Sequence, residues 1–407
     1  MSLLLALLLA AAPTTPTLVD VKSWPDYGLS SFGQQRVAAP YRLADLINTY
    51  SFDLDVWASR IDGGSVTHLP NEAALLLTGN ASGGVAEIRT DDQYRYQAGV
   101  GQRIWQTVVS GPTDAGQVYR WGYYDDSDGL YWQHDSSGLR FGLRTSTDGG
   151  VTNTLYSVAG SRNLERGNIY EIAFQWLGVG LVRTWVNGNP AVQVPNAGQR
   201  AQVYMKTAYL PLSYEARGGT GAATLKVICA SVQSEGGTFP PKPTFAQRRN
   251  ASLSVSAGAA NVPIISVRAS RIFQGQPSRV QLEPTNAWCF SNSQRIRADV
   301  VYNPATLTSA NFTQAFTESA ADFDTAATGY DGGVYVAGFG VPAAGAGSRD
   351  LTQAFGELNR KLRRRAFVGN ADSGTLSADL DTVTIAITNP DNQTTLVNCG
   401  IEWGEVR

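Results

Sequence analysis

Short alternations of hydrophobic and polar residues run along most of the chain, separated by clusters of Gly, Asn and Asp. Between residues 50 and 110, the segments SFDLDVW, AALLLTG, VAEIRT and RIWQTVVSG follow this pattern. In LRFGLR, residues 139–144, Leu and Phe alternate with Arg and Gly, so one face of that strand is expected to be apolar and the other solvated. A period of two residues is typical of strands with one buried face. The pattern predicts an all-β protein of the sandwich or barrel class.

Turn residues and prolines divide the alternating pattern into units. Asn187-Gly188 lies between two alternating runs and predicts a two-residue hairpin turn. The stretch SEGGTFPPKPTF, residues 234–245, favours an extended spacer because its prolines cannot join a central strand. We expect an extended N-terminal arm at 1–48, a β-sandwich at 49–237, a Pro-rich linker at 238–248 and a smaller C-terminal β-sandwich at 249–407.

One segment has a helical rather than a strand period. In DLTQAFGELNRKLRRRAF, residues 350–367, the apolar residues Leu351, Phe355, Leu358 and Leu362 fall on one helical face. The same segment holds a basic cluster that includes Arg363, Arg364 and Arg365. This cluster is either the solvated face of the helix or a patch that docks onto an acidic protein partner or surface glycan.

Composition excludes several classes of function. Lys and Arg total 32 against 34 Asp and Glu, so the chain lacks the basic field that nucleic-acid binding needs. Two histidines leave little material for a zinc site or for a nucleophile with a histidine base. The three cysteines, Cys229, Cys289 and Cys399, are far apart without CxxC spacing and are expected to be buried, reduced thiols. No cofactor and no metal are predicted.

The N-terminus, MSLLLALLLAAAPTTPT, carries a leucine run that is too short to span a bilayer and lacks a basic region before it. We expect an apolar arm that packs on the chain or on a partner, rather than a secretory signal. The candidate partner-docking residues in this run are Leu3, Leu4, Leu5 and Leu7.

The stretch RWGYYDDSDGLYWQHD, residues 120–135, concentrates aspartates and aromatic rings. Asp125, Asp126 and Asp128 before Gly129 resemble the start of a calcium loop, but the later ligands of such a loop are missing. A tight turn capped by these aspartates is favoured, with a hard cation and catalysis as alternatives. Adjacent aspartates do not flank a sugar across a cleft as a glycosidase acid pair does.

Other polar and aromatic residues have two interpretations. Tyr131 and Trp132 are candidates, with the three aspartates, for binding a sugar ligand, although alternation also favours Trp132 as a packing residue. His134 is expected to be a surface histidine rather than a general base. Glu171 and Glu215 stand singly in strand patterns, where solvent or salt-bridge contacts are expected.

Several segments together resemble, in the same order, a family of tailed-phage virion structural proteins. They are SSFGQQRVAAPYRL, THLPNEAALLLT, YRYQAGVGQRIWQT, RWGYYDDSDGLYW, FQWLGVGLVR, VYMKTAYLPLSYEA and LKVICASVQSEGG. The resemblance covers roughly residues 30–237 and implies a concanavalin A-like jelly roll. The hairpin around Asn187 is also similar to one in laminin-G-like domains. No catalytic residues come with this resemblance.

The resemblance implies a non-enzymatic protein on the exterior of a phage particle, as a head decoration, a head fibre or a tail-associated adhesin. The implied partners are other virion proteins, namely capsid or tail subunits, and a host surface glycan, with no nucleic acid and no membrane span. A homo-oligomer is expected, with a trimer as the form suggested by analogy with such appendages. The alternatives are an enzyme that degrades surface polysaccharide, with Asp125, Asp126 or Glu215 as acids, and a secreted carbohydrate-binding lectin.

Overall fold

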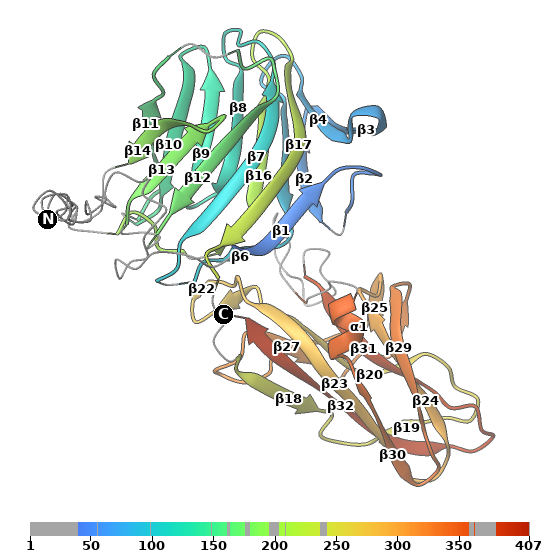
Figure 1. Cartoon of the computed structure of the whole chain (residues 1–407). Helices are drawn as coiled ribbons and strands as arrows, with labels where there is room; N and C mark the ends of the chain where they lie inside the picture. Colours follow the sequence, from blue (N-terminus) through green and yellow to red (C-terminus); the bar gives the residue numbers. More distant parts are fainter. Residues whose placement is uncertain are drawn as a thin grey trace, which may run out of the picture.

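The computed structural model describes residues 40–54, 56–97, 99–147, 149–160, 163–175, 180–194, 203–207, 209–236, 242–357, 362 and 380–406. The described chain is built almost entirely of antiparallel strands, and Figure 1 shows them gathered into two bodies, one from each half of the chain. Among the described residues, no helix is long and apolar enough to cross a membrane.

The N-terminal body is a sandwich of two large sheets. The eight-stranded sheet has the order β14 (Asn189–Val194), β13 (Val182–Val186), β12 (Asn168–Phe174), β7 (Gln102–Ser110), β17 (Ala223–Ser234), β4 (Ala74–Gly79) and β3 (Gly64–Leu69), with β1 (Tyr41–Ile47) also paired to β17. The seven-stranded sheet has the order β11 (Thr152–Ser157), β10 (Gly138–Thr145), β9 (Gly129–Asp135), β8 (Val118–Tyr124), β16 (Leu212–Arg217), β5 (Val85–Thr90) and β2 (Trp57–Asp62). This unit is a concanavalin A-like jelly roll, as expected.

Alternation along the strands decides what lies between the two sheets. In β10, Phe141 and Leu143 are buried in the core, whereas Arg140 and Arg144 lie on the other face of the strand. This confirms the prediction from the LRFGLR pattern. The Asn187-Gly188 turn is also confirmed, because both residues have positive φ angles of 52° and 74° and join β13 to β14.

Residues 41–47, expected in the extended arm, instead form β1 in the eight-stranded sheet. The arm interpretation of this part is wrong, since Leu43 and Leu46 pack against the core. A β-bulge between Arg42 and Ala44 interrupts the alternation, which hides the strand from a period-two pattern.

The C-terminal body is a smaller sandwich. Its five-stranded sheet has the order β18 (Thr244–Arg248), β32 (Thr395–Val406), β23 (Gln281–Ser291) and β30 (Gly345–Asp350), with β19 (Leu253–Val255) also paired to β32. Its six-stranded sheet has the order β26 (Thr313–Gln314), β27 (Ala321–Asp324), β20 (Val262–Ala269), β31 (Thr382–Thr388), β24 (Ile296–Tyr302) and β29 (Val334–Val341).

Two of the cysteines are not free thiols. Cys289 on β23 and Cys399 on β32 lie directly opposite each other and form a disulfide with a Cα–Cα distance of 4.1 Å. The expectation of reduced thiols is wrong for this pair, because strand pairing brings together residues that their spacing in the sequence keeps apart. Cys229 is free and partly buried.

The structure describes the segment of the expected helix, 350–367, only at residues 350–357 and 362. Helix α1 spans Thr352–Glu357, and Leu362, expected on its apolar face, instead forms a β-bridge with Leu282. Leu362 is still buried in the core, so the apolar position serves packing in a different conformation. The docking candidates Arg363, Arg364, Arg365, Leu3, Leu4, Leu5 and Leu7 lie outside the described residues.

Candidate functional site

A row of polar residues crosses the outer face of the seven-stranded sheet. From β2 to β10, directly opposed positions on neighbouring strands are Arg60, Glu87, Glu215, Arg120, Gln133 and Arg140. We call this row the polar ladder. Because neighbouring strands lie about 4.8 Å apart, the ladder covers about 24 Å of the sheet. The residues before and after Arg120, Tyr119 and Trp121, are buried in the core, so the ladder faces away from it.

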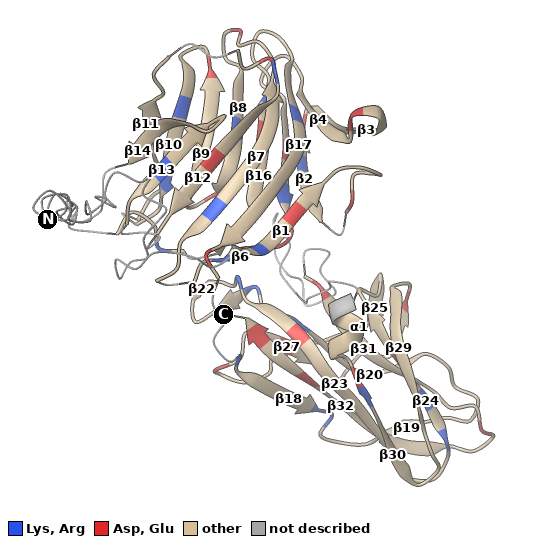
Figure 2. Cartoon of the chain, viewed as in Figure 1, with Lys and Arg blue, Asp and Glu red and all other residues tan. Residues whose placement is uncertain are grey.

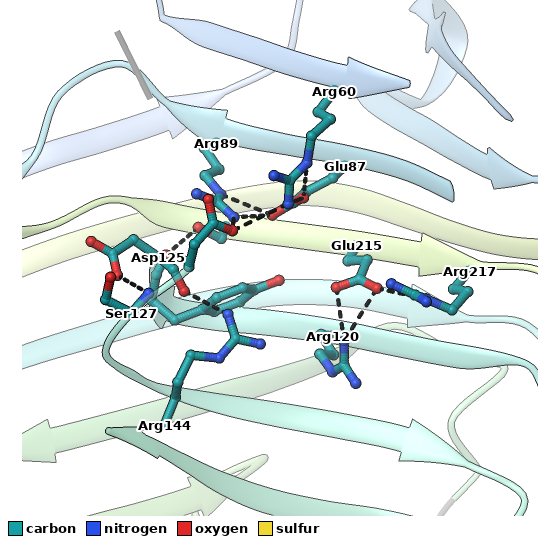
Figure 3. Close-up of polar contacts among 12 residues, drawn as sticks. Arg60, Glu87, Arg89, Arg120, Asp125, Ser127, Arg144, Glu215 and Arg217 are labelled. Atoms are coloured by element: carbon teal, nitrogen blue, oxygen red, sulfur yellow. Dashed lines mark hydrogen bonds and ion pairs between the residues drawn. The ribbon is translucent and has the colours of Figure 1, made fainter. Parts of the chain in front are cut away.

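At the centre of the ladder, Glu87 and Glu215 lie directly opposite each other. Like charges in this position destabilise a sheet unless other groups offset them. Arg60 and Arg89 hold Glu87, at 2.5 Å from Arg60 Nη2 to Oε2 and 2.8 Å from Arg89 Nε to Oε1. Figure 3 shows these two arginines on either side of the carboxylate.

Glu215 is held by a second pair of arginines. Arg120 Nη1 lies 3.0 Å from its Oε2, and Arg217 Nε lies 3.2 Å from its Oε1 (Figure 3). Burial by itself would raise the pKa of Glu215, but the charges of Arg120 and Arg217 outweigh it and lower that pKa. Glu215 is therefore ionised at neutral pH. The expected salt-bridge contact of this residue is confirmed.

The arginines of the ladder are more exposed than the carboxylates that they bind. The side chain of Arg60 is 50% exposed and that of Glu87 is 2% exposed. For Arg120 and Glu215 the values are 22% and 6%. Figure 2 shows basic and acidic positions on strands of the same sandwich. Solvent, or a ligand, therefore meets mainly guanidinium groups along the ladder.

Beside the ladder, two tyrosines form a floor beneath arginines. The guanidinium of Arg144 lies 5.1 Å from the ring centroid of Tyr124 and 5.4 Å from that of Tyr131. Arg120 lies 6.0 Å from the Tyr131 ring. The floor depends on Gly142, where a Cβ atom would lie 2.3 Å from the Tyr131 ring. These cation–π contacts fix the orientation of the guanidinium groups above the rings.

The turn interpretation of the aspartates is confirmed for Asp125. Its Oδ1 accepts hydrogen bonds from the backbone N–H groups of Ser127 and Asp128 at 2.7 and 2.9 Å. Its Oδ2 forms an ion pair with Arg279, which precedes β23 of the C-terminal sandwich. The turn thus also connects the two sandwiches.

Asp126 and Asp128 serve different partners from Asp125. The Oδ1 atom of Asp126 lies 2.5 Å from Arg89 Nη2 and 3.2 Å from Arg60 Nη2. Asp128 is buried and accepts a hydrogen bond from the backbone N–H of Ser146 at 2.9 Å. The carboxylates do not converge on one point, and no group of His, Cys, Asp or Glu in the described part of the chain could hold a metal ion.

Tyr131 and Trp132 do not form an exposed sugar platform. They are 1% and 0% exposed: Trp132 lies in the core between the sheets, and Tyr131 lies beneath Arg120 and Arg144. Their selection as exposed ligand-binding residues is wrong. Alternation along one strand shows which face a ring lies on, but it cannot show whether side chains from neighbouring strands cover that ring.

His134 is buried in the core rather than lying at the surface. Its ring stacks on Tyr119, and its Nδ1 is 2.9 Å from the hydroxyl of Ser110. Burial lowers the pKa of His134, and the nearby charge of Asp135 only partly offsets this.

The sequence patterns did not identify most of the site. The sequence pattern gives no reason to select Arg60, Glu87, Arg89, Arg120 or Arg144, and it does not show a partner for Glu215. The pattern VAEIRT places Glu87 and Arg89 on the same face of one strand. This placement is the one sequence feature that could have indicated a charged pair at the site. The pairing of β5 with β16, which brings Glu87 opposite Glu215, joins residues far apart in the chain.

Comparisons with known proteins give only a likeness of fold. No family model and no curated protein matches the chain. The carbohydrate recognition domain of Emp46p, in its metal-free form, is 11% identical, with a TM-score of 0.33 over 47% of this chain and 95% of that one. An endo-1,3-β-glucanase from Streptomyces sioyaensis is 12% identical, with a TM-score of 0.38 over 48% of this chain and 96% of that one.

An endo-β-1,4-glucuronan lyase from Trichoderma reesei is 10% identical, with a TM-score of 0.35 over 47% of this chain and 95% of that one. These values are too low to transfer a ligand or a reaction to this chain. The assignment of the jelly roll rests on the order and pairing of its strands.

Proposed function

We propose that this protein is a non-enzymatic structural protein on the exterior of a tailed-phage particle, and that its N-terminal sandwich binds a surface glycan along the polar ladder. The observation that carries this proposal is the arginine pairing of the central carboxylates, Glu87 and Glu215. It favours a fixed binding surface over an acid–base pair.

A glycosidase needs one carboxylic acid that is protonated at working pH, which requires a raised pKa. Glu87 and Glu215 lie directly opposite each other on adjacent strands, where the Cβ atoms of opposed residues are about 5 Å apart. However, the arginines lower the pKa of Glu215, so it stays ionised and has no proton to donate at neutral pH. This electrostatic environment favours binding.

A glycan presents many hydroxyl groups, which bind best to an array of fixed donors and acceptors. The ladder supplies such an array, because its side chains hold one another in place. Arg120 Nε donates to Gln133 Oε1 at 2.9 Å while its Nη1 binds Glu215. Preformed polar groups reduce the entropy that a ligand must lose on binding.

Assignment to the particle exterior rests on the ordered segments between residues 30 and 237 that resemble virion proteins. It is tested by electron microscopy of particles labelled with an antibody to residues 250–407. Label over the capsid would support a decoration or head fibre, and label at the tail would support an adhesin. Particles without label that contain no copy of the chain by mass spectrometry would overturn this part of the proposal.

The non-enzymatic part is tested by incubating the protein with bacterial surface polysaccharides and following their length by size-exclusion chromatography. We expect binding without shortening. Shortening that disappears in the Glu87→Gln, Glu215→Gln double variant would instead support the glycan-degrading alternative and place its acids in the ladder.

A further inference from the structure

We infer that the glycan bound by this face is acidic and that a sugar carboxylate binds the guanidinium of Arg144. This inference rests on the proposed glycan-binding function and specifies the chemistry of its ligand. Arg144 lies on β10, which pairs with β9, the strand that holds Tyr131. It also lies beside the turn at Asp125 (Figure 3).

Arg144 differs from the ladder arginines in having no carboxylate partner. Its Nε donates to Asn153 Oδ1 at 3.1 Å, and its Nη1 donates to the backbone oxygen of Asp125 at 2.5 Å. Both acceptors are neutral, and the carboxylate of Asp125 pairs with Arg279 instead. Within the described part of the chain, Arg144 forms no ion pair.

By contrast, every other arginine that projects from this face of the sheet is paired with a carboxylate. These are Arg60, Arg89, Arg120, Arg140 and Arg217. A partly buried guanidinium without a counter-ion is an electrostatic cost that an anionic ligand relieves. The fork of a guanidinium also matches the two oxygens of a carboxylate.

The surroundings of Arg144 keep it in position for such a ligand. Its contacts with the rings of Tyr124 and Tyr131 and its two hydrogen bonds fix the guanidinium plane before a ligand arrives. The hydroxyl of Tyr124 is buried and has no hydrogen-bond partner among the described residues. Burial and the nearby charges of Glu87 and Glu215 raise the pKa of Tyr124, so this hydroxyl keeps its proton and can donate.

The accessible charge near Arg144 is mainly positive, because the one exposed carboxylate beside it, that of Asp126, is paired with Arg89 and Arg60. Along the ladder the carboxylates are nearly buried and the arginines lie above them. The chain as a whole has a net charge of −2, so any attraction of this face for anions is local and is not a property of the whole molecule. A carboxylated sugar fits this local attraction better than a long nucleic acid, which gains its affinity from many phosphate contacts.

The ligand class is tested with a panel of polysaccharides on the full-length protein. The panel comprises alginate, polygalacturonate, hyaluronan and polysialic acid, each intact and after chemical reduction of its carboxyl groups to alcohols, with neutral dextran, dextran sulfate and single-stranded DNA. Binding is measured by biolayer interferometry at two salt concentrations. We expect at least one intact acidic glycan to bind and its carboxyl-reduced form to bind at least about tenfold more weakly, as loss of a charge-assisted contact implies.

The role of Arg144 is tested on the same panel. Arg144→Gln should weaken binding of the acidic glycan about tenfold or more, and Arg144→Lys should retain part of it because the charge stays while the fork is lost. Arg295→Gln, which removes an exposed arginine of the C-terminal sandwich paired with Asp391, is the matched control and should change nothing. Thermal unfolding of each variant checks its folding.

The outcomes separate this inference from the proposed function. Equal binding of intact and carboxyl-reduced glycans, or binding of neutral glycans only, would overturn the acidic ligand and leave glycan binding in place. Stronger binding of dextran sulfate or DNA than of every carboxylated glycan would also overturn it. Binding of no glycan at all would overturn the inference and the glycan-binding part of the proposed function together. Because the carboxyl-reduction comparison uses the unaltered protein, it holds even if an Arg144 variant fails to fold.

Discussion

The two sandwiches share an architecture of packed antiparallel sheets but arrange their charged residues differently. In the N-terminal sandwich, ion pairs join neighbouring strands across one sheet face, and their carboxylates are nearly buried, as with Arg60 and Glu87. In the C-terminal sandwich, Arg268 pairs across strands with Asp322 at a longer distance, 3.4 Å, whereas Arg297 pairs with Asp299 on its own strand and is 63% exposed. The C-terminal sandwich also has a disulfide between its central strands.

This difference shows how one architecture can serve two purposes. Cross-strand pairs such as Arg120–Glu215 use the sheet itself to fix a polar surface, which is useful for recognition. Exposed pairs such as Arg297–Asp299 contribute little to stability and fix little geometry. We expect the N-terminal sandwich to depend on its charges for stability, and the C-terminal sandwich on its core and its cross-link.

The largest contrast is expected when one arginine is removed from each sandwich. Arg89→Ala should destabilise the fold by about 3–5 kcal/mol, because it removes a buried partner of Glu87 and leaves that buried charge undercompensated. Arg297→Ala should leave stability unchanged within error, because water replaces the exposed guanidinium. Guanidinium chloride unfolding followed by tryptophan fluorescence measures both variants. Equal losses in the two would contradict the comparison.

Reduction of the disulfide should affect the C-terminal sandwich specifically. The bond joins residues 110 positions apart, and its loss should cost about 2–4 kcal/mol. Calorimetry with and without reductant measures the change, and the Cys399→Ser variant should reproduce it without reductant. Under denaturing conditions, thiol titration should find one cysteine before reduction and three after it. Three reactive thiols before reduction would disprove the cross-link.

Acid should weaken the N-terminal sandwich through its paired carboxylates. Burial alone would raise the pKa of Asp126, but Arg89 and Arg60 lower it to about 2, and the pKa of Glu215 is lowered as well. Because the folded pKa lies below the unfolded value, the stabilisation is present above about pH 4 and is lost as pH falls toward 2.

Protonation of Asp126 is expected to change stability less than the Arg89→Ala substitution or loss of the disulfide. The Asp126 side chain is 61% exposed, so solvent screens its pairing with Arg89. Thermal unfolding midpoints between pH 2 and pH 7 measure the loss. The Asp126→Asn variant should show a flatter dependence in this range than the unaltered protein. An identical profile for the two proteins would rule out a contribution from this carboxylate.

The strand pattern predicted the all-β class and the inward face of individual strands, as with Phe141 and Leu143 in β10. It also predicted the turn at Asn187-Gly188. These features depend on neighbours in the sequence, where periodicity and turn propensity act. The pattern failed for β1, because a bulge shifts its alternation, and for Leu362, because an apolar position can pack in a helix or in an extended segment.

The sequence by itself therefore determined which residues could share a strand face, such as Glu87 with Arg89, since side chains alternate along any strand. Only the tertiary structure decided that β5 would lie beside β16, bringing Glu87 opposite Glu215, and that β23 would lie beside β32, bringing Cys289 opposite Cys399. The physical reason is that strand pairing and register are set by burial of the whole core, whereas alternation is a local property of the backbone.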